Sequence, residues 1–314
     1  MKKKKEKGAY FPILWRNTCR HKSLLLLCAP AITFFLVFAY IPMAGIVIAF
    51  QDFNVIKGIT GSEFIGLKNF RFFVQAPNSM RIILNTLWLN TLFISSGLIM
   101  ALAIAITLSE IKGKWFKRIT QSVAILPHFI SWTVVAMILT IFLASDTGVI
   151  NQVLKAIGLT PVSFYTSPGI WPVILVLLKI WQGAGFGSIV YLAAIMGIDQ
   201  EIYEAASIDG AGKLRKIISI TLPMLKSTIV ILLIMSVGKI FNGDFGMVYA
   251  IVGSNSTLYP TTDIIDTYVY RALMELGDMG MSSAVGLSQS IVGFLFVIAT
   301  NKIARRLSPD AALF

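Results

Sequence analysis

Charged residues are scarce in this chain. Asp, Glu, Lys and Arg make up 13% of its 314 residues, whereas soluble domains carry about 25%. Hydrophobic residues reach 56%, mean hydropathy is +0.78, and the apolar residues gather in several almost uninterrupted runs. The composition therefore excludes an ordinary soluble protein and indicates an integral membrane protein.

Cysteine and histidine are also rare, with two of each. Cys19 lies in a basic N-terminal segment and Cys28 near the start of the first apolar run, so we expect no disulfide framework. Neither these residues nor His21 and His128 have the spacing of metal ligands. We expect reduced or lipid-buried thiols, structural histidines and no metal site in this chain.

The sequence lacks the groups that drive transport or catalysis. No segment matches Gly-x-x-x-x-Gly-Lys-Ser/Thr, so we expect no phosphate-binding loop, no enzyme activity and no cofactor in this polypeptide. The apolar runs contain almost no acidic residues, which a proton- or sodium-coupled carrier usually places within its spans. The energy for transport would come from an ion gradient or from another protein.

The formal net charge of +12 needs a different explanation from nucleic-acid binding. A nucleic-acid groove interleaves basic and aromatic residues, and this sequence has no such stripe. The basic residues instead cluster beside apolar runs, as residues that set membrane topology do. The expected contact is membrane lipid and not nucleic acid.

Six apolar segments are long enough to cross a membrane, since about 20 helical residues span the ~30 Å hydrocarbon core. The first, 24–50, exceeds the ~7–15 residues of a signal-peptide core and has no clear small-residue cleavage site, so we expect it to be retained. The other five are expected near residues 86–108, 121–144, 171–198, 223–241 and 282–300. The prediction is an all-α integral membrane protein with six transmembrane helices.

These limits define the remaining segments. Residues 1–23 form a basic N-terminal segment that can lie along the interface as a short elbow helix. Residues 51–85 form an external loop, 86–303 hold the other spans, and 304–314 form a tail. Six spans put both termini on the same side of the membrane.

Charge indicates which side that is. One side collects 19 of the 27 Lys and Arg residues, from the N-terminal segment, the tail, and the stretches at 112–118 and 213–226. The opposite loops hold six. By the positive-inside rule both termini and the stretch at 199–223 face the cytoplasm.

Two lysines fall within the spans. Lys179 is followed by Trp181 and Gln182, and Lys239 by Asn242. A charge at membrane depth costs at least ~2.5 kcal/mol, so a wet cavity, a carboxylate or an interface is expected beside each. These five residues are candidates for a substrate path, and snorkelling near a span end is the structural alternative.

The polar stretch at 199–223 separates two spans and has its own local signals. Asp199 can cap a short helix, Gly210 is a poor helix-interior residue, and Asp209 before it can cap whatever follows. Pro223 then suits the first turn of the next span. The pattern predicts a helix, a glycine break and a second short helix, although a plain solvated connector has the same composition.

The same stretch resembles the EAA pattern of ABC importer permeases. That pattern reads Glu-Ala-Ala, three residues, Gly, nine residues, Ile-x-Leu-Pro, and here it occupies Glu204-Ala205-Ala206, Gly210 and Ile220-Thr221-Leu222-Pro223. The triplet Asp209-Gly210-Ala211 is the form of the sugar-importing branch. Weaker similarity extends over most of the chain, at residues 64–70, 85–87, 180–194 and 267–271.

The resemblance implies a MetI-like five-helix core with an extra N-terminal helix. It also implies a cytoplasmic coupling helix that docks on an ATPase, with Glu204 at the contact, Ala205 and Ala206 allowing close approach, and Gly210 forming the bend. Ser207, Asp209 and Ala211 belong to the same loop. ATP and Mg²⁺ would bind to the partner ATPase.

The implied function is a permease subunit of an ABC importer for oligosaccharides in a bacterial plasma membrane. The implied partners are a second, related permease forming a heterodimer, two ATPase subunits and an extracellular solute-binding protein. The two intramembrane lysines raise the option of an acidic sugar. Import of a peptide or polyol, a secondary carrier working alone, and a membrane-embedded assembly or sensor subunit are the alternatives.

Overall fold

The computed structural model describes residues 22–75 and 78–307. Most of the expected elbow segment and residues 308–314 of the expected tail lie outside the described residues. The described part is built from helices and one small sheet, in which β1 (Gln51–Asp52) pairs antiparallel with β2 (Glu63–Phe64).

The helices follow one another with short connections. Before and at the first long helix they are α2 (Lys22–Phe35), the π-helix η1 (Leu36–Tyr40), α3 (Ile41–Met43), the 3-10 helix η2 (Ala44–Phe50), α4 (Gly58–Gly61), α5 (Lys68–Gln75) and α6 (Ser79–Glu110). The middle of the chain holds α7 (Lys114–Ile125), η3 (Leu126–Phe129), α8 (Trp132–Leu143), α9 (Val149–Ala156), η4 (Phe164–Thr166), η5 (Pro168–Ile170) and α10 (Trp171–Met196). The rest comprises α11 (Gln200–Ile208), α12 (Lys213–Lys216), η6 (Ile217–Thr221), α13 (Leu222–Met224), α14 (Lys226–Val237), α15 (Phe245–Val252), η7 (Ser256–Leu258), α16 (Tyr259–Thr262), α17 (Ile265–Leu276) and α18 (Met279–Leu307).

The described residues contain between four and six candidate membrane spans, and two of the six are bent. Four described helices are long and apolar enough to cross a membrane: Leu26–Phe50, Ser79–Glu110, Pro168–Met196 and Met279–Arg305. Two bent pairs bring the total to six if each pair counts as one span: Lys114–Phe129 with Trp132–Leu143 at 93°, and Lys213–Met224 with Lys226–Val237 at 58°. Six spans are therefore compatible with the fold, and the chain is a multi-pass membrane protein.

The expected spans over 121–144 and 223–241 are bent and not continuous helices. In the first, Pro127 sits in the 3-10 turn η3 and Ile130 is extended, after which Ser131 caps α8 by accepting a hydrogen bond from Val134 N. In the second, Pro223 lies inside a helical run that breaks at Leu225. Proline lacks the N–H that a continuous helix needs, so the break at Pro127 has a local cause.

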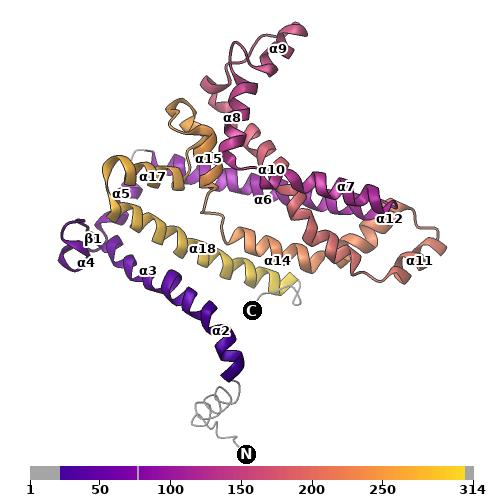
Figure 1. The fold of residues 1–314 in the computed structure, drawn as a ribbon, viewed down its shortest axis with the longest axis horizontal. Helices are drawn as coiled ribbons and strands as arrows, with labels where there is room; N and C mark the ends of the chain where they lie inside the picture. The colour runs from indigo at the N-terminus through magenta and orange to yellow at the C-terminus, as the bar shows by residue number, and fades with distance from the viewer. Residues whose placement is uncertain (1–21, 76–77, 308–314) are drawn as a thin grey trace, which may run out of the picture.

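The centre of the molecule is the long contact between α6 and α10, which lie side by side in Figure 1. Small residues allow this approach: Ala101 and Ala105 of α6 are buried with Tyr191 and Leu192 of α10. A Cβ added at Gly187 of α10 would lie 3.3 Å from the Ala101 Cβ. Close backbone approach through small residues is the usual way for helices to associate in lipid.

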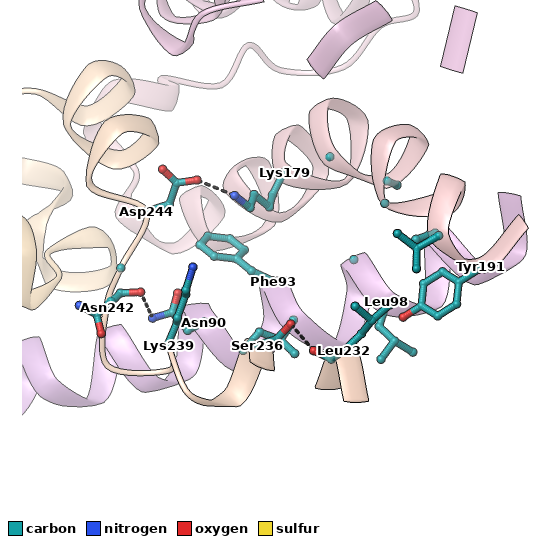
Figure 2. Close-up of a pocket in the computed structure, with 18 of the residues that line it drawn as sticks. Asn90, Phe93, Leu98, Lys179, Tyr191, Leu232, Ser236, Lys239, Asn242 and Asp244 are labelled. Carbon is teal, nitrogen blue, oxygen red and sulfur yellow. Dashed lines mark hydrogen bonds and ion pairs between the residues drawn. The ribbon is translucent and has the colours of Figure 1, made fainter. Parts of the chain in front are cut away.

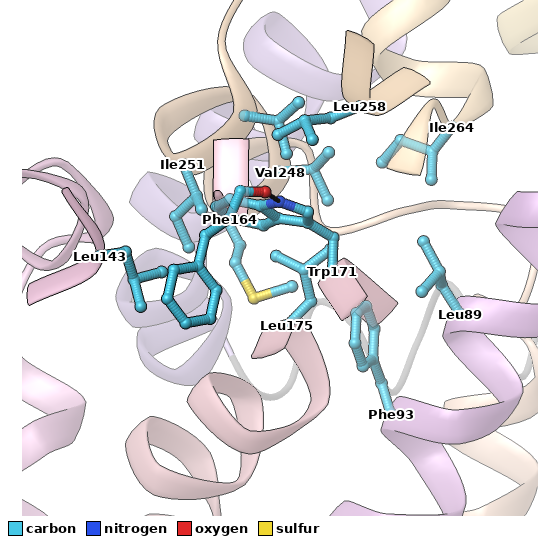
Figure 3. Close-up of a cluster of buried hydrophobic side chains, with 12 residues drawn as sticks. Leu89, Phe93, Leu143, Phe164, Trp171, Leu175, Val248, Ile251, Leu258 and Ile264 are labelled. Carbon is cyan, nitrogen blue, oxygen red and sulfur yellow. Dashed lines mark hydrogen bonds between the residues drawn. The ribbon is translucent and has the colours of Figure 1, made fainter. Parts of the chain in front are cut away.

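The segment 242–281, which lies between the last two expected spans, is mostly helical and partly buried. This segment supplies Met247 and Val248 from α15, Leu258 from η7 and Ile264, the N-cap of α17, to the largest apolar cluster of the described residues, together with residues of α6, α8 and α10 (Figure 3). The indole of Trp171, which is fully buried, donates a hydrogen bond to Phe164 O at 2.7 Å within this cluster.

The first span stands apart from the others. Figure 1 shows α2 leading away from the bundle, and the apolar window of Leu26–Phe50 is 0% buried within the molecule. Its end is fixed: Ala49 is fully buried, and Asn69 of α5 donates a hydrogen bond to Ala49 O at 3.1 Å. Such an apolar surface needs lipid or another membrane subunit around it.

Two basic stretches of the chain lie at one end of the long axis of the molecule. Figure 1 places α11, α12 and the start of α7 at one end and α5, α17 and the small sheet at the other. The basic stretches 112–118 and 213–216 therefore meet at the same end of the molecule.

Candidate functional site

An open cavity of about 670 Å³ lies between α6, α10, α14 and the loop that follows α14. The α6 residues that line it occupy the middle of that long helix, so the cavity lies near mid-membrane depth if α6 spans the bilayer. The lining consists of Asn90, Phe93, Ile94, Gly97, Leu98, Ala101, Lys179, Gly183, Ala184, Gly187, Val190, Tyr191, Leu232, Ser236, Lys239, Asn242, Gly243, Asp244 and Phe245.

Glycine in α10 has two distinct uses. A Cβ added at Gly185 would lie 1.8 Å from Ala124 O, so this residue allows α7 to pack against α10. A Cβ added at Gly183 or at Gly97 of α6 would meet no atom within 4 Å among the described residues. Gly185 and Gly187 therefore serve helix packing, whereas Gly183 leaves space open in the cavity.

Three side chains from different helices hold the backbone of the loop 238–244. Asn90 of α6 donates to Ile240 O at 2.7 Å and to Asn242 O at 3.2 Å. Gln289 of α18 donates to Phe241 O at 2.7 Å. Asp266 of α17 accepts from Gly243 N at 2.6 Å. We call these three side chains the loop clamp.

The shortest hydrogen bond that the loop clamp makes is the one from Gly243 N to Asp266. A Cβ added at Gly243 would lie 2.3 Å from Ile264 Cδ1 and 2.9 Å from Asp266 Oδ2, so only glycine fits. Burial raises the pKa of the Asp266 carboxyl, and the hydrogen bond from Gly243 N opposes that effect.

The two cavity lysines differ in their surroundings (Figure 2). Lys179 Nζ lies 2.5 Å from Asp244 Oδ2 and 6.0 Å from the centre of the Trp132 ring. The other oxygen of Asp244 accepts from Met247 N at 3.1 Å and so caps α15. Lys239 is exposed, and no residue of the described part forms a hydrogen bond or ion pair with its ammonium group.

Three of the five predicted path residues line the cavity, namely Lys179, Lys239 and Asn242. Trp181 and Gln182 are not among its lining residues. Consecutive helical residues are about 100° apart, and the lining residues of α10 (Lys179, Gly183, Ala184, Gly187, Val190 and Tyr191) fall on one arc of the helix that leaves out positions 181 and 182. Gln182 instead donates to Ile130 O at 2.9 Å and supports the break before α8, while Trp181 is 46% exposed.

The stretch at 199–223 forms the predicted helix, glycine break and second helix. Asp199 caps α11 by accepting from Glu201 N at 3.0 Å, as predicted. Gly210 has φ +76°, and Ala211 N donates to Ala206 O at 2.8 Å, which is a Schellman ending. The expectation that Asp209 caps the next helix is wrong. Asp209 is the C-cap of α11, and Gly212 precedes α12 with no capping side chain among the described residues.

We call residues 199–223 the coupling loop, after the role that the family resemblance implies; they project from one end of the molecule (Figure 1). Glu204, Ala205 and Ser207 are exposed, and α11 contains no buried residue. Apolar side chains are exposed beside them: Ile208 is 88% exposed and Leu214 is 70% exposed. An apolar surface rimmed by polar residues is typical of a protein interface.

Sequence reasoning missed the loop clamp. Asn90 and Gln289 were visible as polar residues inside apolar runs, which is a signal of a buried contact. Asp266 carried no such signal, because it lies between two of the expected spans and not inside an apolar run. No group of three His, Cys, Asp or Glu side chains in the described residues could hold a metal ion.

The sequence of the chain is similar to known transport proteins. Residues 97–309 match the family model described as binding-protein-dependent transport system inner membrane component. The chain is 38% identical to Protein LplB of Bacillus subtilis (strain 168) over 291 residues, which cover 93% of this chain and 91% of LplB. It is 37% identical to the polygalacturonan/rhamnogalacturonan transport system permease protein YteP of the same organism over 291 residues, 93% of this chain and 90% of YteP.

The fold is similar to solved transporters. One is the crystal structure of a bacterial alginate ABC transporter in complex with an alginate pentasaccharide-bound periplasmic protein, with TM-score 0.84, 35% identity, and coverage of 94% of this chain and 98% of that one. Another is a bacterial ABC transporter involved in the import of the acidic polysaccharide alginate, with TM-score 0.85, 36% identity, and coverage of 94% and 99%. Together with the EAA pattern of the coupling loop, these similarities show that the chain belongs to the family of binding-protein-dependent transport system inner membrane components.

Proposed function

We propose that the chain is the permease subunit of an ATP-driven ABC importer for oligosaccharides, and that it links a translocation path to a separate ATPase. The observation that carries the proposal is the continuity of α10. Its middle lines the cavity, and only Gly197 and Ile198 separate its end from Asp199, the cap of α11. A force on the coupling loop therefore reaches the cavity through one rigid helix.

The exposed surface of the coupling loop supports docking on an ATPase. Glu204 presents a carboxylate, Ala205 and Ala206 let a partner backbone approach, and Ile208 offers an apolar contact. Closure of two ATPase subunits would move α11 and change which side of the membrane the cavity faces. ATP and Mg²⁺ bind to those subunits in this proposal.

The assembly would be completed by two further kinds of subunit. A second, related permease would form a heterodimer with this chain and close the open side of the cavity. A solute-binding protein would dock at the end opposite the coupling loop. The alginate transporter solved in complex with a periplasmic protein supports that partner.

The substrate class follows from the relatives and the cavity. Two of the similar proteins are a permease of a polygalacturonan/rhamnogalacturonan transport system and a transporter involved in the import of alginate, which supports an oligosaccharide derived from a polysaccharide. A cavity of about 670 Å³ falls within the roughly 300–1,000 Å³ of small-molecule sites. Asn242, Ser236 and the lysines supply polar groups at its wall.

The orientation we propose puts both termini and the coupling loop in the cytoplasm of a bacterial cell, with the chain in its plasma membrane. The basic stretches that meet at the coupling end support it, because cytoplasmic loops carry an excess of Lys and Arg.

Two measurements test the proposal. We expect a tagged form of this chain, extracted gently from its native membrane, to co-purify with an ATPase and a second permease. We also expect the reconstituted complex to take up sugar only with ATP inside and the solute-binding protein outside. A complex without ATPase, or uptake driven by an ion gradient alone, would contradict the proposal and favour a secondary carrier.

A further inference from the structure

The lining of the cavity carries one positive charge that no residue of the described part neutralises. Its charged lining residues are Lys179, Lys239 and Asp244. Lys179 and Asp244 neutralise one another at 2.5 Å, so the remaining positive charge resides on Lys239. Its ammonium group has no ion-pair or hydrogen-bond partner among the described residues.

The loop that carries Lys239 is held in place by side chains of three helices. Lys239 follows α14 within the loop 238–244, whose next residues are fixed by the loop clamp of Asn90, Asp266 and Gln289. The same loop carries Asp244, which faces Lys179 across the upper part of the cavity in Figure 2. The loop held by the loop clamp therefore carries both Lys239 and Asp244, the residue that neutralises Lys179.

A cation without a counter-ion is unfavourable at membrane depth, because the charge is poorly solvated there. An anion bound beside Lys239 removes that cost. The solved alginate transporter, which moves an acidic polysaccharide, shows that a carboxylated sugar is a cargo of a related fold.

We propose that Lys239 binds a carboxylate of an acidic oligosaccharide, and that Asp244 occupies Lys179 until a substrate carboxylate replaces it there. This inference rests on the proposed function and narrows it to uronic-acid sugars. Lys239 is then the specificity-determining residue. Asp244 competes with the substrate for Lys179, so neutral sugars and small anions do not bind to Lys179.

The test compares sugars that differ only in their carboxylates. The probes are a galacturonic acid trimer and a galactose trimer of the same linkage, with the mannuronic acid and mannose trimers as a second pair. Uptake is measured in liposomes that contain the complete importer with its own second permease, ATPase and solute-binding protein. The wild type should take up at least one uronic trimer.

Lys239→Met should reduce uptake of the uronic trimer by roughly tenfold or more, the order expected from loss of one charge-assisted hydrogen bond. Uptake of the matching neutral trimer, where it occurs, should change less than about twofold, and Lys239→Arg should preserve the preference. Lys302→Met, at an exposed lysine near the end of α18, is the matched control and should leave both rates unchanged.

The variant Asp244→Asn tests whether Asp244 competes with the substrate carboxylate for Lys179. The amide oxygen can still accept from Met247 N, so the cap of α15 is retained while Lys179 loses its counter-ion. We expect the half-saturation concentration for the uronic trimer to fall several-fold. Lys179→Met added to Asp244→Asn should abolish that gain.

The outcomes separate this inference from the proposed function. Uptake of neutral but not uronic trimers by the wild type, or equal losses for both trimers in Lys239→Met, overturns the inference and leaves the importer function standing. Equal losses would assign Lys239 to structure or to a lipid headgroup. Failure of ATP-driven uptake for all four trimers would contradict the proposed function itself.

Discussion

The phenolic oxygen of Tyr203 in α11 lies 2.9 Å from the hydroxyl oxygen of Thr221, in the helical run that leads into α14. Lys216 of α12 also donates a hydrogen bond to Ser207 of α11. These contacts join α11 to α12 and η6, and this helical run continues past the bend at Leu225 into α14, whose far end at Ser236 lines the cavity. The coupling loop is therefore connected to the cavity through α14 as well as through α10.

Tyr203→Phe should weaken this second connection without removing the ring. Loss of one hydrogen bond typically costs about 0.5–1.5 kcal/mol, so we expect the complex to assemble while less sugar is moved for each ATP hydrolysed. The ratio of uptake to ATP hydrolysis in liposomes measures this. Tyr165→Phe is a matched control, since it removes a hydroxyl contact to Thr140 between η4 and α8, outside the coupling loop. An unchanged ratio in Tyr203→Phe would show that α10 alone transmits the motion.

Glu204→Arg should uncouple ATP hydrolysis from uptake or prevent ATPase binding. Glu204 is exposed on α11, so charge reversal there does not disturb the folded chain but reverses the electrostatics of the proposed contact. Co-purification and ATP-dependent uptake are the measurements. Glu275→Arg reverses an exposed charge on α17 and should leave ATPase binding intact. Normal uptake by Glu204→Arg would remove Glu204 from the proposed contact.

Gly210→Ala should destabilise the end of α11 through backbone conformation and not through a clash. A Cβ at this position would meet no described atom within 4 Å, but φ is +76°, and the left-handed conformation costs a residue with a Cβ roughly 1–2 kcal/mol. We expect lower uptake and faster proteolysis of the loop, with partial recovery in Gly210→Asn.

Gly212→Ala provides the comparison for that prediction. Gly212 has φ −68°, and a Cβ there also meets no described atom within 4 Å. This variant should behave as the wild type. Equal effects at both positions would show that the loop needs small residues for docking and not a left-handed bend.

Asp266 should tolerate an amide but not an alkyl group. Asp266→Asn keeps an oxygen for Gly243 N, whereas Asp266→Leu leaves that buried N–H without an acceptor, at a cost of about 1–3 kcal/mol. Thermal unfolding of the purified complex in detergent should therefore show a loss only for the leucine variant. Equal losses in both would show that the negative charge itself is required.

The raised pKa of Asp266 gives that comparison a dependence on pH. The folded protein holds the proton more tightly than the unfolded chain, so the stability contributed by protonation is present near the usual carboxyl pKa of about 3.9 and is lost as pH rises through the raised value. On acidification the wild type should gain stability relative to Asp266→Asn. A difference that is constant across this pH range would contradict a raised pKa.

Local sequence determined the parts of this protein that depend on neighbours along the chain. The apolar runs predicted the spans because a bilayer core demands about 20 apolar residues whatever surrounds them. Asp199 and Gly210 predicted the start and the end of α11, since a cap and a left-handed turn are satisfied within a few residues. The spacing of Glu204, Gly210 and Pro223 was enough to indicate the family.

Tertiary structure decided what depends on residues far apart. Lys179 and Asp244 are 65 positions apart, and neither their pairing nor the free state of Lys239 follows from composition. Trp181 and Gln182 seemed to belong to the path because they adjoin Lys179, but helical rotation turns them away from the cavity. The contacts of Asn90, Asp266 and Gln289 with one loop arise only when α6, α17 and α18 pack together, because their partners are backbone groups that every sequence carries.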